Sequence, residues 1–163
     1  MSVLKNKRNL SKMEFYHTAR RLRREIIFLM RRDFGIHNKR NASKIDPELP
    51  DDFFNEDISD FRKNVKILLR NLIWNITAGN TIFPKNENQA NKRWHYQTKA
   101  IINCERIHQE FLCAEDILPL DISKLIPYVE LIETEIKLLK GWRKANNKIL
   151  KQAKKREGGK NNK

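Results

Sequence analysis

The sequence predicts an all-α protein, an antiparallel up-down-up-down four-helix bundle. The chain of 163 residues contains only five glycines and five prolines, and 39% of its residues are hydrophobic while 33% are charged. This balance is typical of helical globular proteins. Apolar residues recur at steps of three and four in four segments, which is the spacing of one helix face. Two of the connections between these segments are short, which favours neighbouring helices that run in opposite directions.

The first helix is expected at residues 11–34, after a basic arm at residues 1–10. Ser11-Lys12-Met13-Glu14 has the S-x-x-E form of a capping box, in which the serine and glutamate side chains each bond a backbone amide of the first turn. Gly35 is expected to end this helix. The predicted inward stripe consists of Phe15, Ala19, Leu22, Ile26 and Leu29.

The second and third helices are expected at residues 57–78 and 88–116. An acidic, proline-containing connection at residues 36–56 precedes the second helix, and Gly79 is expected to end it. The predicted inward residues are Ile58, Phe61, Val65, Leu68, Leu72 and Ile76 on the second helix, and Ala100, Cys104, Ile107 and Phe111 on the third.

The fourth helix is expected at residues 121–156, with Asp121 as N-cap and a fraying basic tail at residues 157–163. Its inward stripe consists of Leu125, Val129, Ile132, Ile136 and Leu139. A second apolar row lies beside that stripe and consists of Leu131, Leu138, Trp142 and Ile149. This row indicates either a wide core face or a contact between subunits, and Trp142 is the residue expected at such an interface.

The formal net charge of +14 and the sequence pI of about 10.0 indicate an anionic partner, with nucleic acid ahead of an acidic membrane surface. The longest apolar run is Ile26 to Met30, so no membrane span is predicted. The N-terminus also lacks the apolar core of a signal peptide. We therefore expect a cytoplasmic protein in which Cys104 and Cys113 are unpaired thiols.

Each predicted helix has basic residues opposite its apolar stripe. One such row is usually a solvated surface, but four in a strongly basic chain favour phosphate binding. The predicted nucleic-acid-binding residues are Arg20, Arg21, Arg24, Arg31, Arg32, Lys63, Lys66, Arg70, Lys92, Lys99, Arg106, Lys137, Lys140, Arg143, Lys144 and Lys148. Trp94, His95 and Tyr96 stand beside Lys92 and Arg93 and could stack on unpaired bases, although packing is the commoner role of such rings. Trp74 has the same two interpretations.

The sequence gives little support for catalysis, and we expect no enzyme activity, cofactor or metal. Phosphate-binding loops and C-x-x-C or H-E-x-x-H motifs do not occur. Cys104 and His108 are four residues apart, but no second pair completes a metal site. One alternative is a ribonuclease, because Arg31 or Arg32 followed by His37 resembles the R-x(4–6)-H motif of HEPN-type ribonucleases.

The segment from Leu138 to Lys148, LLKGWRKANNK, is similar to the Gly-x-Trp-basic ending of a family of four-helix bundles. Asn75 to Asn80, Tyr96 to Ala100 and the basic first helix support the resemblance. The family contains the accessory variability determinant of diversity-generating retroelements and is related to the bundle proteins of ribosomal RNA intervening sequences.

The resemblance implies a homo-oligomeric, pentameric basic barrel that is not itself an enzyme. It implies that the protein binds a reverse transcriptase and its template RNA and supports mutagenic complementary-DNA synthesis. A generic basic, RNA-binding or ribosome-associated bundle is a further alternative.

Overall fold

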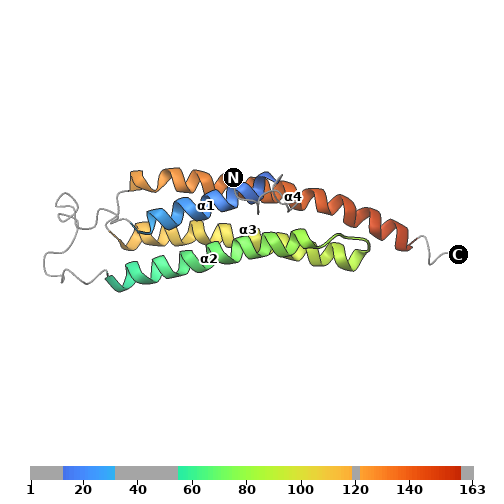
Figure 1. Ribbon diagram of the computed structural model, residues 1–163, viewed down its shortest axis with the longest axis horizontal. Helices are drawn as coiled ribbons and strands as arrows, with labels where there is room; N and C mark the ends of the chain where they lie inside the picture. Colours follow the sequence, from blue (N-terminus) through green and yellow to red (C-terminus); the bar gives the residue numbers. More distant parts are fainter. Residues whose placement is uncertain (1–12, 32–54, 119–121, 159–163) are drawn as a thin grey trace, which may run out of the picture.

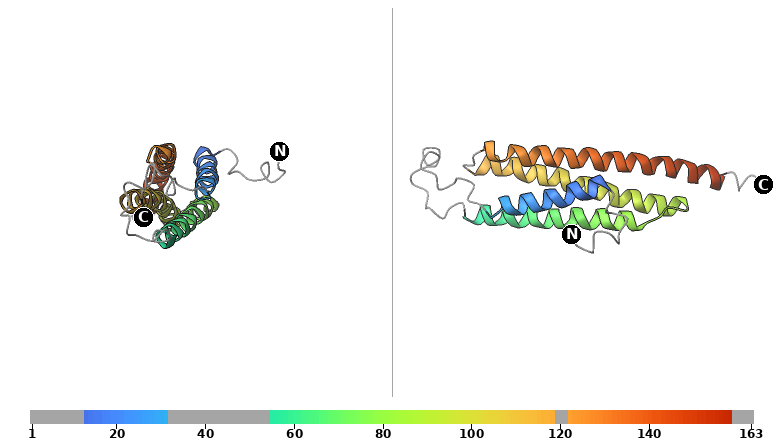
Figure 2. Two further views of the ribbon diagram at one scale, coloured as in Figure 1. Left: turned by 90° about the vertical axis from the view of Figure 1, so that its left-hand side faces the viewer. Right: turned by 45° about the horizontal axis from the view of Figure 1, so that its top comes forward.

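The computed structural model describes residues 13–31, 55–118 and 122–158, and within these ranges it contains helices and no strand. The four α-helices are α1 (Glu14–Leu29), α2 (Asn55–Thr81), α3 (Glu87–Ile117) and α4 (Ile126–Gly158), and the short 3-10 helix η4 (Ile122–Lys124) precedes α4. They lie side by side along one long axis and form a four-helix bundle (Figure 1). Seen from the end, α1 neighbours α2 and α4, and α3 lies diagonally across from α1 (Figure 2). The all-α prediction is confirmed.

Contacts between helices fix the levels at which they pair. Between α3 and α4 the pairs are Ala90 with Asn146, Thr98 with Arg143, and Glu105 with Lys140. Between α2 and α3 they are Phe61 with Phe111, Asn64 with Glu110, and Trp74 with Tyr96. The shorter α1 covers only part of this length, and its Phe15 meets Trp142 of α4. Among the described residues, the bundle beyond that level consists of α2, α3 and α4 (Figure 2).

The predicted inward stripes form one continuous core. Every residue predicted to point inward on α2 and α3 is buried, whereas Phe15 on α1 and Val129 on α4 are half-buried. Phe61 and Phe111 meet edge to face, with their ring centroids 5.6 Å apart. Each fully buried aliphatic or aromatic side chain contributes roughly 1.5–3 kcal/mol of transfer free energy. The apolar periodicity therefore identified the core correctly.

Helix α1 is shorter than predicted at both ends. It begins at Glu14 with Met13 as N-cap and no capping side chain, while Ser11 of the predicted capping box lies outside the described residues. The helix ends at Leu29 instead of residue 34, because the amide of Arg31 donates to the carbonyl of Phe28 (3.2 Å) and closes a tighter final turn.

Gly79 does not end α2, which continues to Thr81. The residue is buried, and a Cβ atom there would lie 3.0 Å from Cη2 of Trp142 and 3.2 Å from Cβ of Tyr96. The absence of a side chain at Gly79 thus permits the close approach of α2 to its neighbours, and this glycine is not a helix stop. The sequence alone could not distinguish these two roles.

The predicted fourth helix is divided at its start. Residues Ile122–Lys124 form η4, and α4 begins at Ile126 instead of residue 121. Pro127 stands in the first turn of α4, where its missing N–H costs no intrahelical bond. At the other end, α4 continues through Gly158, two residues past the predicted boundary at 156.

The predicted start of the second helix at residue 57 and the predicted limits of the third at 88 and 116 lie within two residues of the observed ones, at Asn55, Glu87 and Ile117. The other boundary predictions lie largely outside the described residues. These are the basic arm at 1–10, the acidic connection at 36–56 apart from its last two residues, and the end of the tail from residue 159. Both cysteines are free thiols, as predicted, with Cys104 buried and Cys113 exposed.

Among the described helices, none combines the length and apolarity needed to cross a membrane.

Candidate nucleic-acid interface

The charged residues of α2, α3 and α4 are divided along the long axis of the bundle, and the arginines of α1 are considered separately below. We call residues 68–104 and 139–152 the basic end; they include ten basic residues and one acidic residue, Glu87. We call residues 55–67, 105–118 and 122–138 the acidic end; they include ten acidic and six basic residues. In Figure 1 the basic end lies on the right, where α2 connects to α3 and α4 ends. Periodicity on single helices did not reveal this division.

The lysines predicted on α4 fall at both ends. Lys137 lies at the acidic end, and Lys140 Nζ lies 3.3 Å from Glu105 Oε1 in an exposed ion pair, a kind that contributes little to stability. Lys144 and Lys148 are exposed at the basic end. Lys151 is exposed on the same side of the helix, because steps of three and four share a face.

Two arginines join α3 and α4 inside the basic end. Arg143 is half-buried, donates from Nη1 to Thr98 Oγ1 (3.3 Å) and lies over the ring of Trp94. Arg93 lies over Trp142, with 5.6 Å between its guanidinium carbon and the ring centroid, and burial lowers its pKa below the ordinary arginine value. Sequence analysis missed Arg93 as a site residue, although its position three residues after the buried Ala90 placed it near the inward stripe.

Four basic residues line a shallow depression on the outer side of α2. It is formed by Ser59, Arg62, Lys63, Lys66, Ile67 and Arg70. Three of the four basic residues were predicted, and Arg62 was missed because it borders the inward stripe. All six are spaced by steps of three, four or one along the same helix, so the depression is a groove between side chains of α2.

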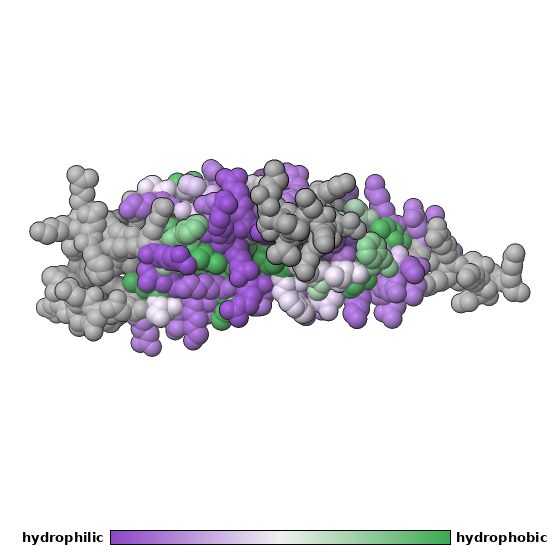
Figure 3. Space-filling model, viewed as in Figure 1, coloured by the Kyte–Doolittle hydropathy of each residue, from purple (hydrophilic) through white to green (hydrophobic). Residues whose placement is uncertain are grey.

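The arginines of α1 do not share one environment. Arg20 lies over the ring of Tyr16 and Arg31 over the ring of Phe28, at 5.8 and 5.7 Å from the centroids. Arg24 Nη2 lies 2.8 Å from Glu25 Oε1. Hydrophilic side chains form a band over α1 and the adjoining part of α2 (Figure 3). Arg23 of α1 is also exposed, although it was not among the predicted binding residues. Arg32 lies outside the described residues.

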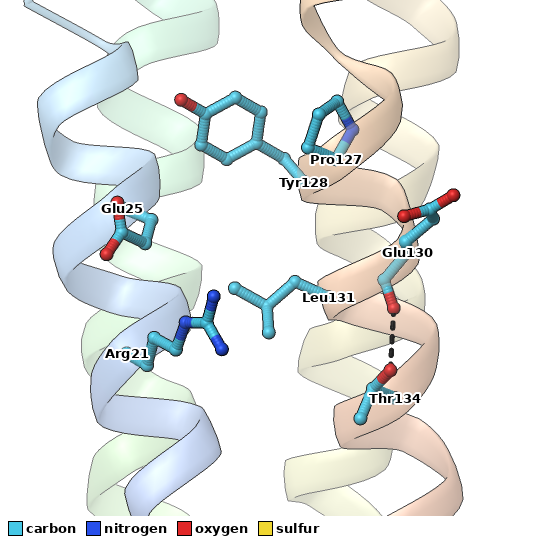
Figure 4. A pocket seen from close by; sticks show the side chains of 7 residues that line it. All are labelled: Arg21, Glu25, Pro127, Tyr128, Glu130, Leu131 and Thr134. Atoms are coloured by element: carbon cyan, nitrogen blue, oxygen red, sulfur yellow. Dashed lines mark hydrogen bonds between the residues drawn. The ribbon is translucent and has the colours of Figure 1, made fainter.

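Arg21 lies in a different place, the groove between α1 and α4. Its side chain points towards Leu131 of α4, and Glu25 lies one turn further along α1, whereas the carboxylate of Glu130 points away from α1 (Figure 4). Thr134 Oγ1 donates to the carbonyl oxygen of Glu130 (2.9 Å). The neighbouring carboxylate of Glu25 makes this groove less favourable for phosphate than the exposed faces of α2 and α4.

The second apolar row of α4 is partly covered by α1. Trp142 stacks on Phe15, with ring centroids 4.4 Å apart and planes inclined by 15°. Leu131 packs against the core, and Leu138 is half-buried. Ile149 lies beyond the start of α1 and is 36% exposed. Packing within one chain thus explains the position of Trp142 without a second subunit. The subunit contact stays a prediction, and Ile149 is the residue of this row that best supports it.

Polar groups are enclosed in the interior of the basic end. Gln97 donates to the carbonyl of Trp142 (3.4 Å), and Asn146 donates to the carbonyl of Ala90 (3.1 Å). In the part of the chain that the structure describes, Gln97 Oε1, Asn146 Oδ1, Asn75 Oδ1 and Trp142 Nε1 are buried without a hydrogen-bond partner. Such groups cost free energy when they are dry. The interior of this end is therefore less well satisfied than an apolar core.

One carboxyl group lies in the core between α3 and α4. Glu135 is 0% exposed, and burial raises its pKa to about 9, so it is neutral at pH 7. Burial, followed by Glu135 and Glu105, raises the pKa of the Cys104 thiol well above its ordinary value. Within residues 13–31, 55–118 and 122–158, no three His, Cys, Asp or Glu side chains gather to hold a metal ion. Cys104 and His108 thus have no completed site among these residues.

The ribonuclease alternative cannot be assembled from the described residues, because His37 and Arg32 lie outside them. Comparison with family models, curated proteins and solved structures finds no match to this chain. The fold and the arrangement of charge therefore define the class of protein: a four-helix bundle with one strongly basic end.

Proposed function

We propose that this chain is a non-enzymatic RNA-binding protein that accompanies a reverse transcriptase. In this proposal it is the accessory protein of a diversity-generating retroelement, acts in the cytoplasm as a homopentamer, and supports mutagenic complementary-DNA synthesis on a template RNA. The observation that best supports RNA binding is the basic end, with ten basic residues and one acidic residue. The reverse transcriptase and the pentamer follow from the resemblance around Gly141 and Trp142.

The electrostatic argument depends on convergence of charge. Scattered surface cations contribute little, whereas several on one surface displace counterions together when they meet a phosphate backbone. Lys144, Lys148 and Lys151 form an exposed row on α4, and Lys92 and Lys99 lie on the neighbouring α3. This arrangement gives affinity and position but not sequence choice.

The convergence would follow from antiparallel, up-down-up-down topology, which belongs to the same proposal. Its support is the order of contacts: as residue numbers rise along α3 from Ala90 to Glu105, their partners on α4 fall from Asn146 to Lys140. Contacts between α2 and α3 change in the same opposed way. Basic residues that are distant in sequence are then brought to one end.

The test of RNA binding compares two sets of three neutralising substitutions. Lys144→Gln, Lys148→Gln and Lys151→Gln remove charges at the basic end, and Arg106→Gln, Lys124→Gln and Lys137→Gln remove the same number at the acidic end. Fluorescence anisotropy with a labelled single-stranded RNA is measured over a range of salt concentrations. We expect the first set to reduce the slope of log K against log salt by about 2, since each lost contact removes about 0.7.

The second set is expected to leave the slope nearly unchanged, because its residues lie at the end that contains nine ionised carboxylates besides the neutral Glu135. Equal effects of both sets would contradict a localised RNA surface. A wild-type protein without measurable RNA affinity would contradict the proposed function as a whole.

The partner and the pentamer have a separate test. Light scattering at high salt, with and without the neighbouring reverse transcriptase, should show a closed oligomer of about five chains that joins the polymerase. Ile149→Glu should weaken the oligomer if this exposed residue is at the subunit contact. A monomer that ignores the polymerase would remove the retroelement role and leave an RNA-binding bundle.

A further inference from the structure

A line of aromatic rings from α2 and α3 crosses the basic end and reaches Arg143 of α4. Trp74 of α2 meets Tyr96 of α3 edge to face, with ring centroids 5.7 Å apart. Tyr96 in turn lies 6.1 Å from the ring of His95. Next along α3, Trp94 lies 5.8 Å from the guanidinium carbon of Arg143 on α4. We call the four rings of Trp74, Tyr96, His95 and Trp94 the aromatic belt.

The belt is open to solvent to a degree that core packing does not explain. Trp74 is 59% exposed and Trp94 is 37% exposed. At the tip of the α2–α3 connection, Phe83 is 69% exposed. In the described part of the chain, only one other phenylalanine or tryptophan is exposed, Phe28 on α1. Exposed large rings gathered at one place indicate a binding surface.

Basic residues flank the belt. Lys92 and Lys99 stand four residues before and three after Tyr96, one helical turn to either side on the same face, and both are exposed. Arg143 closes the belt on the α4 side. The next carboxylate along α3, Glu105, is paired with Lys140. The rings are thus framed by cations.

We infer that the aromatic belt binds unpaired bases of single-stranded RNA, with Trp74 and Trp94 stacking on bases and the flanking cations contacting phosphates. This inference rests on the proposed function, to which it adds the strandedness of the bound segment. Stacking on aromatic side chains suits single strands because every base has an accessible π-face there. In a duplex those faces are covered by neighbouring base pairs, so rings on a protein surface cannot reach them.

The belt and the α4 lysine row therefore do different things. The lysines attract any phosphate backbone, and the belt discriminates in favour of unpaired segments. A template RNA that is being copied exposes unpaired bases ahead of the polymerase, and a surface of this kind would hold them. A purely basic surface would not discriminate in this way.

The experiment compares the double substitution Trp74→Ala, Trp94→Ala with the conservative pair Trp74→Phe, Trp94→Phe. The probes are a labelled oligouridine of about ten nucleotides and an RNA duplex of the same length. We expect the alanine pair to lower oligouridine affinity about tenfold to a hundredfold, while duplex affinity stays within about twofold. The phenylalanine pair should keep most of the affinity, because its rings still stack. Oligouridine should also quench tryptophan fluorescence in the wild type.

Unchanged duplex affinity and an unchanged helical circular dichroism signal serve as the controls for folding. If the alanine pair leaves oligouridine affinity intact, or weakens both probes equally, the inference is wrong while RNA binding stands. If the wild type binds neither probe, the proposed function fails with it. If the alanine pair binds both RNAs normally but no longer joins the reverse transcriptase, the belt is a protein contact and the inference is overturned.

Discussion

The two ends of the bundle differ in their interiors as well as in their charge. At the acidic end Phe61 and Phe111 pack edge to face among aliphatic side chains. At the basic end the helices are joined by Gln97, Asn146 and Trp142, whose buried polar atoms are only partly bonded within the described residues. The first arrangement is what stability alone favours.

Departures from full polar satisfaction tend to concentrate at functional sites, where other requirements compete with stability. The exposed rings of Trp74 and Trp94 are a second departure at the same end. We interpret the acidic end as the part that stabilises the fold and the basic end as the part adapted to binding. Glu135 is the exception, because this buried carboxyl belongs to the acidic end.

The largest expected effect tests this interpretation with one aromatic deletion at each end. Phe111→Ala removes a buried ring and should lower the free energy of unfolding by roughly 3–5 kcal/mol. Trp74→Ala removes a ring that is mostly exposed and should change it by less than about 1 kcal/mol. Urea unfolding followed by circular dichroism measures both. Similar losses for the two variants would show that the basic end contributes to stability as much as the acidic end.

The second largest effect concerns Glu135, the buried carboxyl of the acidic end. Because the pKa of this group is about 9 in the folded protein against 4.5 for an ordinary glutamate, Glu135 loses its proton at lower pH in the unfolded chain than in the folded one. Stability therefore falls between about pH 4.5 and pH 9 and is highest, as far as this group is concerned, below pH 4.5. Glu135→Gln cannot titrate, so it should be more stable than the wild type by about 3 kcal/mol at pH 7 and nearly equal to it at pH 4.5.

The matched control is Glu133→Gln, which removes an exposed carboxylate two residues earlier on α4. Thermal unfolding of both variants at several pH values separates burial from the simple loss of a negative charge. If both substitutions gave the same pH dependence, Glu135 would not be held neutral by its surroundings. The buried carboxyl would then not lower the stability of the acidic end at pH 7.

The helices and their inward faces could be predicted because they depend on local periodicity. Steps of three and four identified the buried stripes from Ile58 to Ile76 and from Ala100 to Phe111. The end of α1 and the division before α4 could not be predicted, because a continuing pattern does not show where a final turn tightens. Gly79 was misinterpreted for a related reason: its role depends on Trp142, which is 63 residues away in sequence.

The candidate site was less predictable than the fold. The exposure of a lysine such as Lys144 can be predicted from the periodicity of its own helix. The electrostatic surroundings of Lys137 and Lys144 differ, however, because the neighbouring helices bring carboxylates to the level of Lys137 and not to that of Lys144. Arg143 was predicted as a site residue and Arg93 was missed. In neither case did the sequence indicate the ring that the arginine contacts, which is Trp94 for Arg143 and Trp142 for Arg93. Charge division along the axis is a property of α2, α3 and α4 together, so no single segment contains it.

The smallest effect concerns how tightly the basic end is packed, and two helical glycines provide the comparison. At Gly141 a Cβ atom would meet nothing within 4 Å, so Gly141→Ala should stabilise the protein by up to about 1 kcal/mol through helix propensity. At Gly79 the same atom would lie 3.0 Å from the ring of Trp142, which the stack on Phe15 holds in place. Overpacking there should outweigh propensity and make Gly79→Ala less stable by roughly 1–2 kcal/mol.

Both free energies come from the same urea titrations, and tryptophan fluorescence reports the surroundings of Trp142 directly. A stabilising Gly79→Ala would mean that the indole can move aside at little cost. The partly unsatisfied interior of the basic end would then be loosely packed as well, and its polar atoms would reach water easily. If Gly79→Ala were destabilising while Gly141→Ala stabilised the protein as expected, the interior of the basic end would be tightly packed. The unbonded polar groups would then persist because the close approach of α2, α3 and α4 fixes the positions of the side chains around them.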